Sequence, residues 1–382
     1  MKKFGICLML LGSALLLNCK QVRKVADFIS EPTAREIYER EFANDTTAFA
    51  EWNSSFLNSK KDSLEVELPY VETGSFTQNL IRTHSYNLEL NKGRIFYAEI
   101  LTDSIAQRVF LDFYRISNDS TQNLKNIKSN EEGERYLSQS IDETGWYKLI
   151  VQPEIDASTN YSLRIYSQPE FGFPVLGRDN TAIQSFWGAV REGGKRSHEG
   201  VDIFADRGTP VLAVTEGRIS STRNRGLGGK QVWQRNGLMG SSLYYAHLDS
   251  ILVKTGQKVQ LGDTLGLVGN TGNARTTKPH LHFGIYQGYK GAIDPLPFIQ
   301  KTEIPVYAEK LPDFEEGRVE VRSSLANLRS QPSIEGTKLG EAKRNEVLTV
   351  FGQTDKWVLV QNQDGLKAYI HQSLIQSPKT SG

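Results

Sequence analysis

The sequence contains very little cysteine. Of its 382 residues only Cys7 and Cys19 are cysteines, and both lie within the first nineteen positions. The rest of the chain has no thiol for a disulfide, so its stability must depend on packing and on metal binding. An excess of charge of one sign is also absent, since 45 basic and 44 acidic residues give a formal net charge of +1. Nucleic-acid binders usually carry a basic excess, so this class of partner is not expected.

Long apolar runs are scarce, and the one at the start is short. Lys2 and Lys3 precede an apolar stretch over residues 4–17, which is too short for a spanning helix and is typical of a secretory signal. The string Leu16-Leu17-Asn18-Cys19 resembles the lipobox of bacterial lipoproteins, in which the cysteine is lipidated. This resemblance implies a signal peptide over residues 1–18 and an exported chain anchored through Cys19, facing the periplasm or cell surface. An ordinary signal peptide or an uncleaved anchor is the alternative.

The length predicts two to four domains. Residues 19–62 are polar, and Ala34, Ile37, Tyr38 and Phe42 recur at helical spacing. We expect short helices on a tether between the membrane and the rest of the chain, or else a solvated spacer.

Residues 63–168 show alternation with period two and short β-branched and aromatic runs, which predict a β-sandwich. Their last strands resemble the jelly-roll pre-peptidase domains of secreted proteases. Residues 318–378 resemble the bacterial Src-homology-3-like domain through Asn327-Leu328-Arg329-Ser330-Gln331-Pro332-Ser333 and the strand at 357–360. That resemblance implies a small C-terminal β-barrel that binds the cell wall. The expected fold class is therefore mostly β and multi-domain.

Glycine is concentrated between these units, where many tight turns are expected. Four of the six histidines lie in this segment. His198 and Asp202 are four apart, which places both side chains on one face of an extended chain, and both types are normal zinc ligands. His280 and His282 also share a face of a strand, and His247 follows Tyr244-Tyr245-Ala246.

The order of these motifs resembles that of the lysostaphin-type zinc endopeptidases of the bacterial cell wall. His-x-Gly-x-Asp comes first, then Ala-His-Leu, then His-Leu-His, within a predicted domain of residues 172–300. The resemblance implies an antiparallel sheet and one Zn2+ held by His198, Asp202 and His282. It also implies that His247 and His280 are catalytic and that the substrate is the peptide part of peptidoglycan.

Other residues near these motifs are weaker candidates. Arg196, Tyr244 and Tyr245 are candidates for lining a substrate groove, with a structural role equally open. Lys278 would place a cation at the groove rim and favour a carboxylate-bearing substrate, or it is simply solvated. The remaining histidines, His84 and His371, are expected to be surface or packing residues.

The sequence thus predicts a zinc endopeptidase that hydrolyses amide bonds of peptidoglycan by metal-activated water. A catalytically silent scaffold that activates another wall hydrolase is the alternative. A further hypothesis is latency, in which residues 20–62 or the sandwich cover the groove. The bond that is cut and any divisome or wall-synthesis partner are left open.

Overall fold

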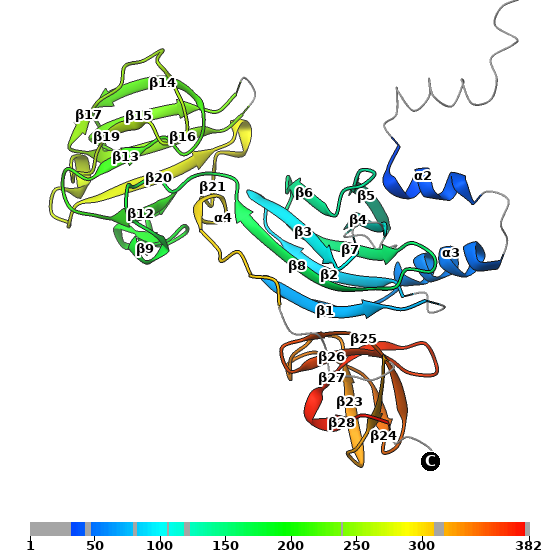
Figure 1. Cartoon of the computed structure of the whole chain (residues 1–382). Helices are drawn as coiled ribbons and strands as arrows, with labels where there is room; N and C mark the ends of the chain where they lie inside the picture. The colour runs from blue at the N-terminus through cyan, green and yellow to red at the C-terminus, as the bar shows by residue number, and fades with distance from the viewer. Residues whose placement is uncertain are drawn as a thin grey trace, which may run out of the picture.

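The computed structural model describes residues 32–42, 47–78, 82–104, 107–117, 123–237, 240–308 and 317–378. They form three β units and a pair of helices near the N-terminal end (Figure 1). The prediction of a mostly β chain with antiparallel sheets is confirmed. The predicted signal segment and Cys19 lie outside the described residues. Within the described ranges no helix is both long and apolar enough to cross a membrane.

The first β unit is a sandwich of two antiparallel sheets, at the centre of Figure 1. Its strands are β1 (Tyr70–Phe76), β2 (His84–Leu90), β3 (Arg94–Thr102), β4 (Val109–Ile116), β5 (Leu124–Ser129), β6 (Tyr136–Ser140), β7 (Gly145–Pro153) and β8 (Thr159–Pro169). One sheet has the order β1-β8-β3-β6 and the other β2-β7-β4-β5. The aromatic rings of Phe96 and Phe113 stack between the sheets with centroids 4.2 Å apart. The alternating residues of the predicted strands therefore have their apolar side in this core.

Two helices, α2 (Ala34–Glu41) and α3 (Thr47–Ser59), pack on the sheet that contains β4 and β7. Tyr38 and Trp52 are almost completely buried against Phe110 of β4. Arg35 forms a buried ion pair with Asp112, whose atoms are 2.7 Å apart. The prediction of a tether is therefore wrong for the residues of α2 and α3, whereas the prediction of short helices is confirmed. The apolar positions at helical spacing bury against the sandwich, so these helices belong to the folded body.

The C-terminal unit is an open sheet. Its strands are β22 (Arg318–Val321), β23 (Leu325–Arg329), β24 (Lys338–Lys343), β25 (Val347–Thr354), β26 (Trp357–Gln361), β27 (Lys367–His371) and β28 (Ile375–Gln376), with the short helix η6 (Gln372–Leu374). Among the described strands no closed barrel forms, which corrects that prediction. Its end strands β24 and β28 do not pair with each other in the described sheet. The first half of β25 pairs with β22, and Gln353 near its end pairs with Thr73 of β1. The sheet thereby continues into the sandwich.

A buried carboxylate lies at the junction of these two units. Tyr70 and Tyr161 donate hydroxyl hydrogen bonds to Glu72 at 2.5 and 2.7 Å, and His84 Nδ1 lies 3.2 Å from the same carboxylate. Tyr70 also contacts the hydroxyl of Tyr369 from β27 at 3.0 Å. Burial would raise the pKa of Glu72, but hydrogen bonds from His84 and the tyrosines hold it below its ordinary value. Burial lowers the pKa of His84, which is a packing residue here.

The middle of the chain forms a separate antiparallel unit, at the upper left of Figure 1. Its elements are η1 (Asn180–Ala182), β9 (Ile183–Ser185), β10 (Val190–Arg191), η2 (Glu192–Gly194), β11 (Arg196–Ser197), β12 (Val201–Phe204), β13 (Pro210–Leu212), β14 (Gly217–Asn224), β15 (Lys230–Arg235), β16 (Ser242–Leu248), β17 (Ser250–Ile251), β18 (Lys258–Val259), β19 (Thr264–Leu267), η3 (Gly272–Ala274), β20 (His280–Tyr286), η4 (Gly288–Lys290), β21 (Ala292–Ile293) and α4 (Leu296–Ile299). The main sheet has the order β18-β14-β15-β16-β20-β12-β9. β16, β20 and β12 lie side by side in it. β16 carries His247, β20 carries His280 and His282, and β12 carries Asp202.

A buried arginine connects this unit to the sandwich. Arg94 of β3 donates to the carbonyl of Gln300 and to the hydroxyl of Thr302, each at 2.6 Å. It also donates to the carbonyl of Ser167 in β8 at 2.8 Å. The segment after α4 is therefore fixed on the sandwich through hydrogen bonds to a charged group, which are stronger than neutral ones.

Candidate metal centre

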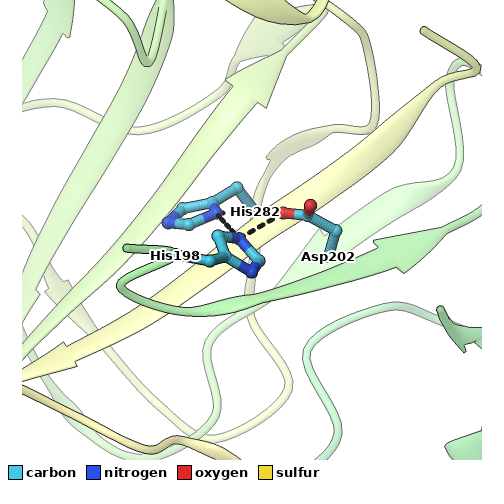
Figure 2. A group of neighbouring side chains, drawn as sticks. All are labelled: His198, Asp202 and His282. Atoms are coloured by element: carbon cyan, nitrogen blue, oxygen red, sulfur yellow. Dashed lines mark hydrogen bonds and ion pairs between the residues drawn. The ribbon is translucent and has the colours of Figure 1, made fainter. Parts of the chain in front are cut away.

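Three potential ligand atoms converge at the centre of the main sheet. His198 Nε2, Asp202 Oδ1 and His282 Nδ1 are each 3.0 Å from the other two. Figure 2 shows the three side chains turned toward one another. They form the single cluster of this kind found among the described residues. A tetrahedral zinc site with bonds of about 2.0 Å separates its ligands by roughly 3.3 Å. The observed triangle is close to that spacing.

The strand register explains why these residues meet. Asp202 of β12 pairs directly with His282 of β20, and His198 comes just before β12. Gly200 lies between the two motif residues, where a Cβ would come within 2.7–2.8 Å of the His282 ring. Glycine is required at this position because the imidazole occupies the space of a side chain.

The hydrogen bonds around the triangle favour a cation at its centre. The carbonyl of Phe186 accepts a hydrogen bond from His198 Nδ1 at 2.9 Å, so the lone pair of the neutral ring is on Nε2. That lone pair faces an oxygen of Asp202. A lone pair and a carboxylate oxygen repel at 3.0 Å unless a positive charge lies between them. These residues therefore fit a divalent metal such as zinc.

Two further histidines lie beside the triangle. His247 Nδ1 bonds the carbonyl of Thr271 at 2.9 Å, and His280 Nδ1 bonds the carbonyl of Lys278 at 2.8 Å. Each ring therefore has its Nδ1 proton engaged and a lone pair on Nε2, and His280 Nε2 lies 4.0 Å from Asp202 Oδ1. Their ring centroids are 5.1 Å apart, and the centroid of His247 is 5.9 Å from that of His282. Burial and the neighbouring imidazoles of His280 and His282 lower the pKa of His247 to about 4.

The backbone of His247 is unusual. Its φ is +64°, a left-handed conformation that non-glycine residues adopt at a cost of about 1–2 kcal/mol. Regular alternation along β16 would place His247 on the face opposite its neighbour Ala246, which pairs with His282. The irregular backbone instead brings the ring beside His280 and His282. Strain of this kind is typical of functional sites.

The histidines border a cavity of about 530 Å³ whose lining residues all belong to the middle unit. Of the groove candidates, Arg196 and Tyr244 line it. Tyr245 does not, which corrects that prediction. Its side chain is fully buried in the core, where its hydroxyl donates to Gln234 Oε1 at 2.8 Å. The side chain of Lys278 is exposed and does not line the cavity, as its solvated alternative predicts.

Comparison with known proteins assigns this unit. Residues 196–295 match the model of peptidase family M23, and residues 323–376 match that of the bacterial SH3 domain. Most of the middle unit is thus similar to M23 peptidases. The predicted relationship to lysostaphin-like cell-wall peptidases is thereby supported for this part of the chain.

Three curated relatives are similar to part of this chain. The L-Ala--D-Glu endopeptidase of Bacillus subtilis is 34% identical over 152 residues, which are 37% of this chain and 46% of that protein. Peptidoglycan DD-endopeptidase ShyA of Vibrio cholerae is 44% identical over 86 residues, 22% of this chain and 19% of that protein. Glycyl-glycine endopeptidase ALE-1 of Staphylococcus capitis is 36% identical over 113 residues, 28% and 30% of the two chains. The chain thus spans less than half the length of each relative.

Sequence reasoning missed several residues of the M23 site. Arg191 Nη2 donates to Asp202 Oδ2 at 2.8 Å and to Ser185 Oγ at 2.5 Å. Gly228 lies against the ring of Tyr244 so closely that a Cβ would come within 1.9 Å of the hydroxyl oxygen. Of the two glycines at this site, only Gly200 belongs to a motif that the sequence pattern reveals, His-x-Gly-x-Asp. Arginine, serine and a loop glycine are too common for their patterns to indicate a site.

Proposed function

We propose that the chain is a zinc-dependent endopeptidase that hydrolyses amide bonds in the peptides of peptidoglycan. The observation that carries this proposal is the triangle of His198, Asp202 and His282 beside two histidines whose Nδ1 atoms bond backbone carbonyls. Three protein ligands with one open position are the arrangement of a catalytic zinc site, whereas structural zinc sites use four. The M23 match and the endopeptidase activities for which the relatives are named support the same class of reaction.

The residues of the chain then have distinct tasks. Zinc, when bound, supplies a Lewis acid that polarises the scissile carbonyl and lowers the pKa of bound water to about 7. His198, Asp202 and His282 hold it. The Nε2 atoms of His247 and His280 accept the proton of the attacking water and return it to the leaving amine. Since the pKa of His247 is lowered to about 4, this ring is a proton acceptor at neutral pH. Arg196 and Tyr244 contact the substrate along the cavity wall.

The specific bond is a matter for experiment. The three relatives are named for an L-Ala–D-Glu bond, a DD bond and a glycyl-glycine bond. Their M23 domains are similarly related to this one, so their names favour none of these bonds. The substrate class proposed here is therefore the peptide moiety of peptidoglycan as a whole.

The proposal is tested by mass spectrometry of the fragments that the purified protein releases from peptidoglycan, with and without a chelator. We expect peptide-bond cleavage that stops with chelator and is restored by zinc. His282→Ala should abolish both zinc binding and cleavage, because it removes one of three ligands. His371→Ala is the matched control, since this histidine lies in β27 outside the site. A protein that binds no stoichiometric metal, releases no fragments and instead activates another hydrolase would establish the scaffold alternative.

The remaining domains are proposed to place this activity at the wall. We propose that residues 1–18 direct export, that Cys19 carries a lipid, and that the SH3 domain binds the wall. The latency hypothesis is not supported for the described residues, because neither helix α2 nor α3 nor the sandwich contributes a lining residue to the cavity. Loss of membrane association in Cys19→Ser would support the anchor, and unchanged membrane association in that variant would exclude it.

A further inference from the structure

The two oxygens of Asp202 have separate partners. Oδ1 lies 3.0 Å from His198 Nε2 and from His282 Nδ1. Oδ2 instead accepts a hydrogen bond from Arg191 Nη2 at 2.8 Å. Building on the proposed zinc-dependent function, we propose that Arg191 is a positioning residue. It occupies Oδ2, so that Asp202 offers the metal one oxygen only.

Arg191 reaches this carboxylate from outside the main sheet. It lies in the β10–β11 hairpin, whose turn contains Gly193 and Gly194 with φ of +67° and +98°. The same Nη2 also donates to the hydroxyl of Ser185 at 2.5 Å. Ser185 pairs with Asp202 in the β9–β12 register. The guanidinium thus links the hairpin to the strand that borders the carboxylate, which fixes the rotation of that carboxylate.

Control of one carboxylate oxygen matters for this type of site. A carboxylate binds metals through one oxygen or through both. A second oxygen from Asp202 would take the position that a catalytic site leaves to water. A hydrogen bond between two charged groups is about twice as strong as a neutral one, so Oδ2 is held firmly. Because guanidinium has several donors in a rigid plane, Arg191 bonds Ser185 and Asp202 together, whereas lysine has only a point charge.

The competing explanation is an ordinary ion pair that stabilises the hairpin. The Arg191 side chain is 33% exposed, and exposed ion pairs contribute little to stability. The same domain contains a suitable control, Arg178 with Asp206 at 3.3 Å, whose side chains are 39% and 96% exposed. Neither control residue lines the cavity. Arg178→Ala therefore removes an arginine from a surface pair without touching the site.

The test replaces zinc with Co²⁺ in the full chain and records the visible absorption, which weakens as cobalt goes from four ligands to five. We expect Arg191→Ala to give the weaker absorption, because Asp202 then binds through both oxygens. Its kcat on peptidoglycan peptides should fall about 10- to 100-fold with little change in KM, the usual effect of losing an outer partner of a ligand. Millimolar guanidinium should restore part of both signals.

Each other outcome decides the matter. If Arg191→Ala has the wild-type cobalt spectrum, or if only KM changes, the positioning role is wrong. Equal effects of Arg191→Ala and Arg178→Ala would also overturn it. Arg191→Lys keeps the charge, serves if the alanine variant does not fold, and should recover the spectrum only in part. The spectrum needs no substrate, so a wild-type protein that binds cobalt without cleaving would refute the proposed function while still testing Arg191.

Discussion

The buried ion pair of Arg35 with Asp112 holds the N-terminal helices on the sandwich. The side chains are 7% and 3% exposed, and Arg35 Nη1 also donates to Gln152 Oε1 at 2.7 Å. The guanidinium lies 3.8 Å from the ring centroid of Phe56. Arg35→Ala would leave the charge of Asp112 buried and without this partner. Removing one member of a buried pair typically costs about 3–5 kcal/mol.

This cost should be measured as local opening, because a chain of several domains is not expected to unfold in two states. Hydrogen exchange of the amides in residues 34–59 reports the free energy of detaching these helices. A loss of about 3–5 kcal/mol accelerates exchange by a factor of at least about 100. Cleavage of peptidoglycan should be unchanged, since no described residue of α2 or α3 lines the cavity.

Glu41→Ala is the matched control in the same helix. Glu41 pairs with Arg108 at 2.9 Å, but these side chains are 47% and 31% exposed. Exposed pairs contribute about 0.2–1 kcal/mol, so the control should change exchange less than about fivefold. If exchange in Arg35→Ala accelerates less than about tenfold, or only as much as in Glu41→Ala, the Arg35–Asp112 pair does not hold these helices on the sandwich. The double variant with Asp112→Ala should recover part of the loss because the unpaired charge is then removed.

Three further predictions concern the site and the junction of the domains. Gly200→Ala should lower cleavage about 100-fold and weaken zinc binding, because its Cβ displaces the His282 ring; wild-type zinc content would argue against this. His247→Ala should keep zinc but lose about 10²–10⁴-fold in kcat, which turnover at fixed metal content measures. The folded pKa values of His84 and Glu72 both lie below their unfolded values. The contribution of His84 to stability is therefore fully present above about pH 6.5 and decreases as the pH falls below that value. The contribution of Glu72 is fully present above about pH 4.3 and decreases below it. Thermal unfolding from pH 7 to 4 checks this, and His84→Phe should flatten the upper part of the profile.

The elements that could be predicted from the sequence are those with a pattern among neighbouring residues. Period-two alternation marked strands that the structure places in β2 and β8, and short β-branched and aromatic runs marked those in β3, β4 and β7. The spacing of four between His198 and Asp202, and of two between His280 and His282, indicated side chains on common faces. The structure gathers His198, Asp202 and His282 in one cluster. Such patterns are readable because side-chain direction repeats with a fixed period along a strand.

The tertiary structure alone decided the features that depend on distant partners. Helices α2 and α3 pack on the sandwich instead of forming a tether because they contact Phe110 and Asp112, which lie far along the chain. The His247 side chain points into the site because its backbone is left-handed. The Tyr245 side chain is buried in the core behind β16 and so lies outside the groove. The continuation of the C-terminal sheet into the sandwich depended on the pairing of β25 with β1. Contact energies of this kind arise only when the fold brings separate segments together, so no local pattern of residues encodes them.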